Sequence, residues 1–169
     1  MGEKLYFLRP LLEKDTPHML EWLHDRTVTE YLQLDGSGAT LADAACFIQS
    51  AQNESVDLHR AVVDCNDTYL GTVSLKNIDT GKREAEYAIA MRASAMGTGA
   101  AFAATQDILN IAFQILGLRR VYLNVLQENQ RAVRFYNKCG FQYTHQGELV
   151  LRGERRVLLW YEKSVKTDT

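Results

Sequence analysis

The chain has few of the residues that mark specialised protein classes. Its 169 residues include 3 cysteines and 2 prolines. The cysteines, Cys46, Cys65 and Cys139, have no C-x-x-C spacing, which argues against a disulfide framework or a structural zinc site and favours a cytoplasmic location. Both prolines lie near the start, so no proline-rich linker divides the chain. We expect one domain over residues 1–164 and a polar tail over 165–169.

An excess of charge and long apolar runs are also missing. The sequence has 19 Lys+Arg against 21 Asp+Glu, a net charge of −2, which predicts no general nucleic-acid-binding surface. No apolar run reaches the roughly 18 residues of a membrane-spanning helix. The early charges at the N-terminus argue against a secretory signal. We expect a globular monomer or homodimer with neither a nucleic-acid nor a membrane partner.

The hydrophobic patterns and turn residues predict alternating elements. Expected strands cover residues 4–9, 58–64, 69–76, 84–91, 119–126, 143–151 and 157–162. One expected helix starts at Asp15, and others cover residues 28–32, 41–52, 99–116 and 131–138. We expect Thr40 and Asp43 to cap the helix over 41–52. The order strand 84–91, helix, strand 119–126 predicts a parallel pair, whereas short connections elsewhere predict antiparallel neighbours. The expected fold is therefore α/β (α+β), with a mixed, mostly antiparallel sheet and helices on both faces.

A glycine-rich turn, SAMGTGAAF, precedes the most apolar helix. Gly97 and Gly99 flank Thr98 where free backbone N–H groups and the helix dipole favour a phosphate or pyrophosphate. Two glycines in a simple tight turn are the alternative. Phe102 stands where a third glycine would complete G-x-G-x-x-G, and no Lys-Ser/Thr pair follows as in a P-loop.

A second block, NQRAVRFYNKCGF, follows the predicted parallel strand. Asn129 and Tyr136 are seven residues apart, so two helical turns place both side chains on one face. This face could present an amide and a phenol to a ligand. Asn129 could instead serve only as a helix N-cap, and Tyr136 as an amphipathic core residue.

The two blocks MGTGAAF and LGLRRVYLNVLQENQRAVRFYNKCGF together resemble the GNAT superfamily of acyl-CoA-dependent N-acetyltransferases. The family loop Q/R-x-x-G-x-G/A falls on Met96, Gly99 and Ala101, and Met96 departs from its first position. The start, LRPLLEKDTPHMLEWLHDRTVTEYL, resembles the branch of ribosomal-protein N-terminal (alanine) acetyltransferases. The resemblance covers about the whole chain.

This resemblance implies a GNAT fold of about six to seven strands, with a splayed parallel pair that binds acetyl-CoA as cosubstrate and no metal. The pyrophosphate would lie on the loop formed by Met96, Gly97, Thr98, Gly99, Ala100, Ala101 and Phe102. Strand residues Ile89 to Met91 would pair with the pantetheine arm, to which Asn129 would also hydrogen-bond. Tyr136 would protonate the leaving thiolate as general acid.

The reaction implied is direct attack of an amine on the thioester, which needs a group that takes the amine proton. Some relatives place a glutamate where this chain has Asn124. The remaining candidates are Glu86, acting through water, and Glu84 on the same strand face. We expect Glu86 to fill this role.

The resemblance implies a primary amine as acceptor and leaves its identity open. Strand YLGTVSLKNID and the segment AEYAIAM are similar to members that act on amino-sugar nucleotides, so we expect a small-molecule amine of that kind. A protein N-terminal α-amine is the alternative. A second alternative is a non-catalytic module that binds acyl-CoA, because Asn124 replaces the glutamate that some relatives have.

Overall fold

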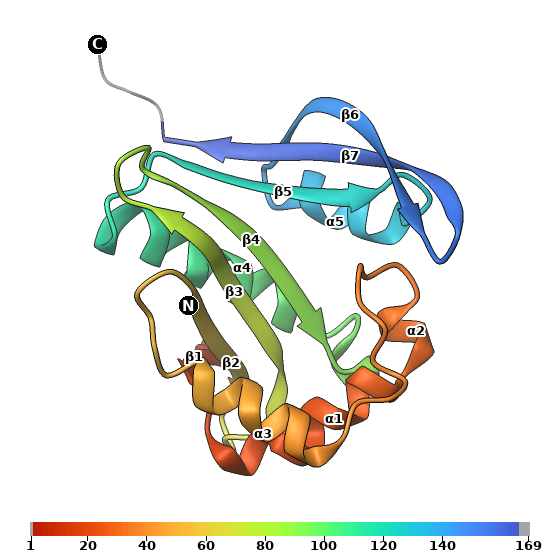
Figure 1. Ribbon diagram of the computed structural model, residues 1–169. Helices are drawn as coiled ribbons and strands as arrows, with labels where there is room; N and C mark the ends of the chain where they lie inside the picture. The colour runs from red at the N-terminus through yellow and green to blue at the C-terminus, as the bar shows by residue number, and fades with distance from the viewer. Residues whose placement is uncertain (1, 166–169) are drawn as a thin grey trace.

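The fold is one seven-stranded sheet. The computed structural model describes residues 2–165, so most of the expected polar tail, residues 166–169, lies outside the described residues. The strand order is β1-β2-β3-β4-β5-β7-β6 (Figure 1). The strands are β1 (Tyr6–Pro10), β2 (Leu58–Asp64), β3 (Tyr69–Asp79), β4 (Glu84–Met91), β5 (Arg120–Leu126), β6 (Gln142–Leu151) and β7 (Glu154–Ser164).

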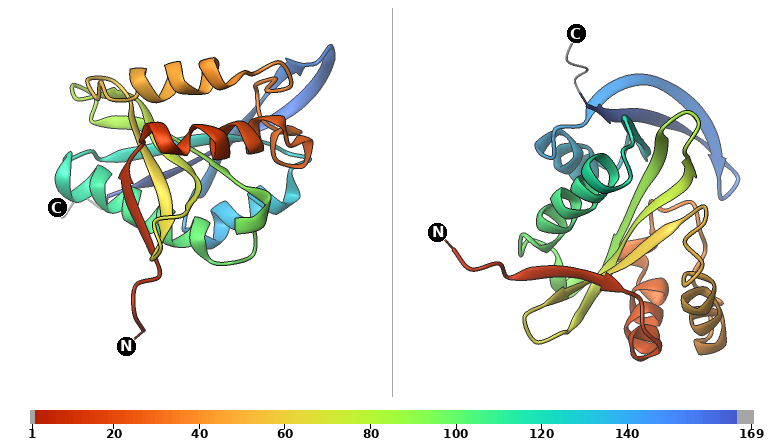
Figure 2. Two further views of the ribbon diagram at one scale, coloured as in Figure 1. Left: turned by 90° about the horizontal axis from the view of Figure 1, so that it is seen from below. Right: turned by 90° about the vertical axis from the view of Figure 1, so that its left-hand side faces the viewer.

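Helices cover both faces of this sheet. They are α1 (Thr16–His24), α2 (Arg26–Thr29), α3 (Leu41–Ser50), α4 (Ala100–Asn110) and α5 (Gln130–Lys138). α1 and α3 lie on one face, and α4 and α5 on the other (Figure 2). The neighbouring strands pair antiparallel except β4 and β5, which pair parallel. The expected mixed, mostly antiparallel sheet with helices on both faces is therefore confirmed.

Local sequence explains most element boundaries. Thr40 and Asp43 form the predicted capping box of α3, with Thr40 N donating to Asp43 Oδ2 at 2.9 Å. Asp15 stands at the N-cap position of α1, but its carboxylate does not cap the helix. Both of its oxygens accept from the Arg9 guanidinium at 2.8 Å instead. A bidentate charged partner outcompetes the helix amides for this buried carboxylate.

The predicted helix 99–116 is divided in the structure. α4 ends at Asn110, and a π-helical turn, Ile111–Ile115, follows before Gly117 ends the segment at a φ of 66°. In this wider turn Leu116 N donates to Ile111 O at 2.9 Å. Leu118 follows it into the core, where it is 2% exposed. Apolar periodicity does not separate an α-helix from a short π-turn, because both bury one face.

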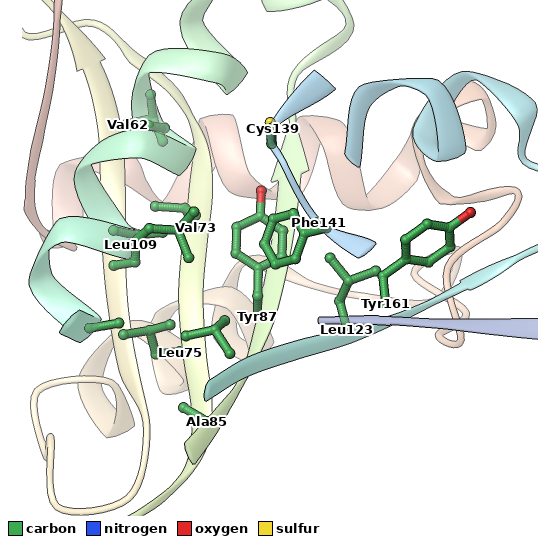
Figure 3. Packing of buried hydrophobic residues seen from close by; sticks show 14 of the residues in the cluster. Val62, Val73, Leu75, Ala85, Tyr87, Leu109, Leu123, Cys139, Phe141 and Tyr161 are labelled. Carbon is green, nitrogen blue, oxygen red and sulfur yellow. The ribbon is translucent and has the colours of Figure 1, made fainter. Parts of the chain in front are cut away.

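Two apolar clusters hold the helices on the sheet. The larger lies between the sheet and the α4–α5 side and includes Val73, Leu75 and Tyr87, with Phe141 packed beside Tyr87 (Figure 3). The smaller includes Met19 and Trp22 of α1 and Ile48 of α3, and covers the other face. Together they fix β4 from both sides.

The parallel pair separates after a short stretch. β4 and β5 share three register positions, the last being Glu86↔Tyr122. Beyond it β4 continues beside β3 to Met91, and β5 beside β7 to Leu126, while the two strands diverge (Figure 1). The sheet therefore contains the expected splayed pair, and it opens a gap between these strands.

Candidate active site

A cleft of about 550 Å³ lies at the gap between β4 and β5. Its walls come from both sides of the sheet. Tyr136 and Asn129 belong to the α5 side, whereas Trp22 of α1 and Phe47 of α3 belong to the opposite side. Two ligands could thus meet at the gap from opposite faces.

The glycine-rich loop lies between the end of β4 and α4. Gly97 has a φ of 77° and Gly99 a φ of 87°, conformations that favour glycine. Within residues 2–165, the N–H groups of Gly97, Gly99, Ala101 and Phe102 donate to no other group. Four free donors beside a helix N-terminus fit a pyrophosphate, and the unpaired edge of β4 fits an extended arm. The chain therefore has the features needed to hold acetyl-CoA.

The other predicted loop residues lie in different surroundings. Met96 is half-buried, and Arg131 Nη1 of α5 lies 3.1 Å from its sulfur, so a guanidinium stands beside the position where the family loop carries Gln or Arg. The Ala100 N–H is already bound to Thr98 Oγ1 at 3.3 Å. Ile89 lines the cleft, whereas the Met91 side chain is 8% exposed and packs in the larger core cluster. A cofactor could therefore contact only the backbone of Met91.

Tyr136 of α5 reaches the cleft from the larger core cluster. Its ring packs edge-on against Tyr87, with centroids 5.8 Å apart. Its hydroxyl bonds to no other residue in the described part of the chain. Burial raises the pKa of Tyr136 well above its usual value of 10.0, with a smaller contribution from Cys139. The phenol therefore stays protonated and can donate.

Asn129 caps α5. Its side-chain oxygen accepts from Ala132 N at 3.3 Å, and its side chain also lines the cleft. Because the cap uses only the oxygen, the amide nitrogen remains a donor for a ligand. The N-cap and the expected cofactor contact are compatible.

Glu86 lines the same cleft from β4. Asn124 Nδ2 lies 3.3 Å from Glu86 Oε1, and Asn77 Nδ2 lies 3.2 Å from Oε2. The second candidate, Glu84, is engaged by Arg120 at 2.9 Å. Of the two glutamates, only Glu86 lines the cleft without an ion pair among residues 2–165.

The structure adds residues to the site that sequence patterns do not reveal. Gln33, in the loop after α2, donates from Nε2 to Asn124 Oδ1 at 2.8 Å. His59 of β2 lies in the cleft wall and its Nδ1 is 2.6 Å from Ser74 Oγ. Desolvation is the main cause that lowers the pKa of His59 below its usual value of 6.5. Gln33 and Asn124 are 91 residues apart, and no local signal links them.

The chain matches a known protein family over most of its length. The acetyltransferase (GNAT) domain family matches residues 6–142. The chain belongs to the GNAT acetyltransferases. It is accordingly an N-acetyltransferase that transfers an acetyl group from acetyl-CoA to an amine.

The relatives of this GNAT chain include polyamine-modifying enzymes. Spermidine N(1)-acetyltransferase of Escherichia coli (strain K12) is 29% identical over 143 residues, which cover 85% of this chain and 75% of that protein. The fold resembles spermidine N-acetyltransferase of Vibrio cholerae, solved with CoA and spermine, with a TM-score of 0.84, 24% identity and 95% of each chain covered.

A dodecameric structure of the Vibrio cholerae enzyme is also similar, with a TM-score of 0.77, 22% identity and 95% and 94% of the chains covered. The expected monomer or homodimer stays a prediction for this GNAT chain. None of the helices within residues 2–165 is long and apolar enough to cross a membrane.

Proposed function

We propose that this GNAT enzyme acetylates a cationic small-molecule amine of the polyamine class. The observation that carries the proposal is the charge of the cleft. Three carboxylates, Asp35, Asp43 and Glu86, line it, against one ammonium group, Lys76. Because opposite charges attract most where water is partly excluded, this lining favours a cation. The spermidine acetyltransferases among the relatives support the same class.

The cleft gives less support to the other two acceptors. An amino-sugar nucleotide carries a diphosphate, which the three carboxylates would repel. A protein N-terminus needs an open groove, whereas the Gln33–Asn124 hydrogen bond joins the loop after α2 to β5. The spermidine acetyltransferases among the relatives favour neither alternative.

The chain supplies a donor and an acceptor for the protons of the reaction. The loop amides would bind the pyrophosphate, and the unpaired edge of β4 would align the thioester with the gap. Glu86 would take the proton of the attacking amine through water. Tyr136 would give its own proton to the departing thiolate, so the CoA leaves as a thiol. Asn124 stands where some relatives have a glutamate, and its contact with Glu86 places a carboxylate beside that position.

A panel of acceptors tests this proposal. Spermidine, spermine, an amino-sugar nucleotide and a peptide with a free N-terminus are each supplied with acetyl-CoA, and thiol release and product mass are measured. We expect the two polyamines to react fastest, with a KM that rises as salt is added.

In the same assay Glu86→Gln should lower kcat about 100-fold. Glu148→Gln, on the exposed strand β6, is the matched control and should keep wild-type kcat. A nucleotide or peptide that reacts better than both polyamines would refute the acceptor class. Full activity of Glu86→Gln would refute the role of this carboxylate.

A further inference from the structure

Neutral amides hold the Glu86 carboxylate in place. Asn124 donates to one of its oxygens and Asn77 to the other. Lys76 is its register partner on β3, yet none of the ion pairs among residues 2–165 involves Glu86. Two other carboxylates of the sheet do pair with a cation, since Arg120 of β5 binds both Glu84 of β4 and Glu162 of β7. A carboxylate that accepts only one amide hydrogen bond on each oxygen keeps lone pairs available for a ligand.

The direction of the hydrogen bonds follows from the charge of Glu86. An ionised carboxylate only accepts, so Asn124 must turn its Nδ2 toward Glu86. Its Oδ1 then faces Gln33, which must donate from Nε2, as the 2.8 Å contact shows. The three side chains thus form a polar chain in which Gln33 fixes the orientation of Asn124, and Asn124 fixes Glu86.

This polar chain spans the gap where the strands part. Glu86 is in the last register pair of β4 with β5, and Asn124 lies two residues further along β5. Gln33 approaches from the loop after α2, on the side of the sheet that carries α1 and α3. The loop is anchored by Arg152, whose Nη1 donates to Glu30 O at 2.8 Å. It is also anchored by Gly36, where an added Cβ would lie 2.2 Å from Leu23 O.

We propose that Asn124 and Gln33 are positioning residues of the acceptor site, which act on the amine through Glu86. Asn124 aims the carboxylate at the gap, and Gln33 prevents the Asn124 amide from turning over. This inference rests on the proposed function, because it assigns to Glu86 the proton of the amine.

A double-mutant cycle tests the proposal with acetyl-CoA and spermidine. Asn124→Leu should lower kcat about 10-fold, the size of one lost hydrogen bond to a charged group, with the KM for acetyl-CoA unchanged. In the Glu86→Gln background the same change should have little further effect, because its route to the amine is already removed. A purely structural role would give the same fold-change in both backgrounds, and that result would overturn the proposal.

Gln33 allows a second test on an exposed side chain, where folding is not at risk. Gln33→Glu keeps the shape but can only accept, so it would turn the Asn124 amide over and present Oδ1 to Glu86. We expect Gln33→Glu and Gln33→Leu each to lower kcat several-fold, whereas Gln106→Leu, an exposed control on α4, should not. Wild-type kcat in Gln33→Glu would refute the orientation argument.

The two hypotheses fail in different ways. If Glu86→Gln is fully active with every amine, the proposed function of Glu86 is wrong. If Glu86→Gln is impaired while Asn124→Leu and Gln33→Glu keep wild-type kcat, the function stands and the positioning role is refuted.

Discussion

Tyr136 shows how one residue can serve both packing and chemistry. Its ring belongs to an aromatic group with Tyr87 and Phe141, and its hydroxyl at the cleft bonds to none of residues 2–165. A core tyrosine usually finds a hydrogen-bond partner, as Tyr87 does with Thr105 Oγ1 at 2.7 Å. The free hydroxyl of Tyr136 therefore favours a role toward a ligand.

Replacing Tyr136 by Phe removes the proton donor and keeps the ring. We expect kcat for the best amine to fall about 100-fold, with little change in thermal stability, because the lost hydroxyl bonds to no described residue. Thiol release measures kcat, and a melting curve measures stability. Tyr143→Phe, on exposed β6, is the control. An unchanged kcat in Tyr136→Phe would show that this tyrosine contributes only to packing.

Among single residues, the sequence predicts best those that lie within a local motif. The seven-residue spacing predicts Asn129 and Tyr136 on one helix face, and both line the cleft. Gln33, His59 and Asp43 lie in the cleft wall through long-range contacts, which no periodicity records. For Met91 the sequence predicted the position at the end of β4 but not the burial of the residue.

At the scale of elements, the loop before α4 is shaped by its backbone. An added Cβ at Gly99 would meet nothing within 4 Å, so the glycine is needed for its φ of 87° rather than for space. Alanine there should cost about 1–2 kcal/mol if the loop keeps its shape. The loop could otherwise relax and turn its N–H groups away from the pyrophosphate.

Gly99→Ala should therefore raise the KM for acetyl-CoA about 10-fold while the amine KM changes little. Gly38→Ala is a matched control, because it also has open space around an added Cβ but no positive φ. Initial rates at varied acetyl-CoA measure the effect. Equal KM values in both variants would contradict the assignment of this loop to the cofactor.

The strands and helices themselves were largely predictable. Alternating apolar residues and turn chemistry located β2 and β4 at their observed bounds. The π-helical turn after α4 was missed, because the apolar pattern of the helix continues through its residues. The gap between β4 and β5 has no signature in composition or periodicity. It was expected only from the family resemblance.

At the scale of the whole molecule, the protonation of His59 in the cleft wall affects the free energy of unfolding. His59 is 8% exposed and bound to Ser74, and its pKa is lowered in the folded protein. Below pH 6.5 the unfolded chain takes up a proton at this residue that the folded protein does not, so the free energy of unfolding falls as the pH falls. The slope from one such group is at most about 1.4 kcal/mol per pH unit.

His59→Gln should remove this contribution. We expect denaturant unfolding between pH 6.5 and pH 5 to show a flatter dependence of stability on pH than in the wild type. A variant that loses stability with acid as steeply as the wild type would show that His59 is not the group responsible.

We expect the fold to bring the two substrates together from opposite sides of one sheet. The loop before α4 leads into the sheet face that carries α4 and α5, and Tyr136 of α5 lines the cleft, whereas Asp43 and Gln33 line it from the side of α1 and α3. Both substrates would then occupy the cleft at once, and no acetyl group would be stored on the enzyme.

Two-substrate kinetics test this central claim most directly. Initial rates of thiol release are measured while acetyl-CoA and spermidine are both varied, and the product is identified by mass. We predict intersecting double-reciprocal lines, an N-acetylated polyamine, and no thiol release without amine. Parallel lines, or thiol release at the same rate without any amine, would contradict direct transfer in the cleft between β4 and β5.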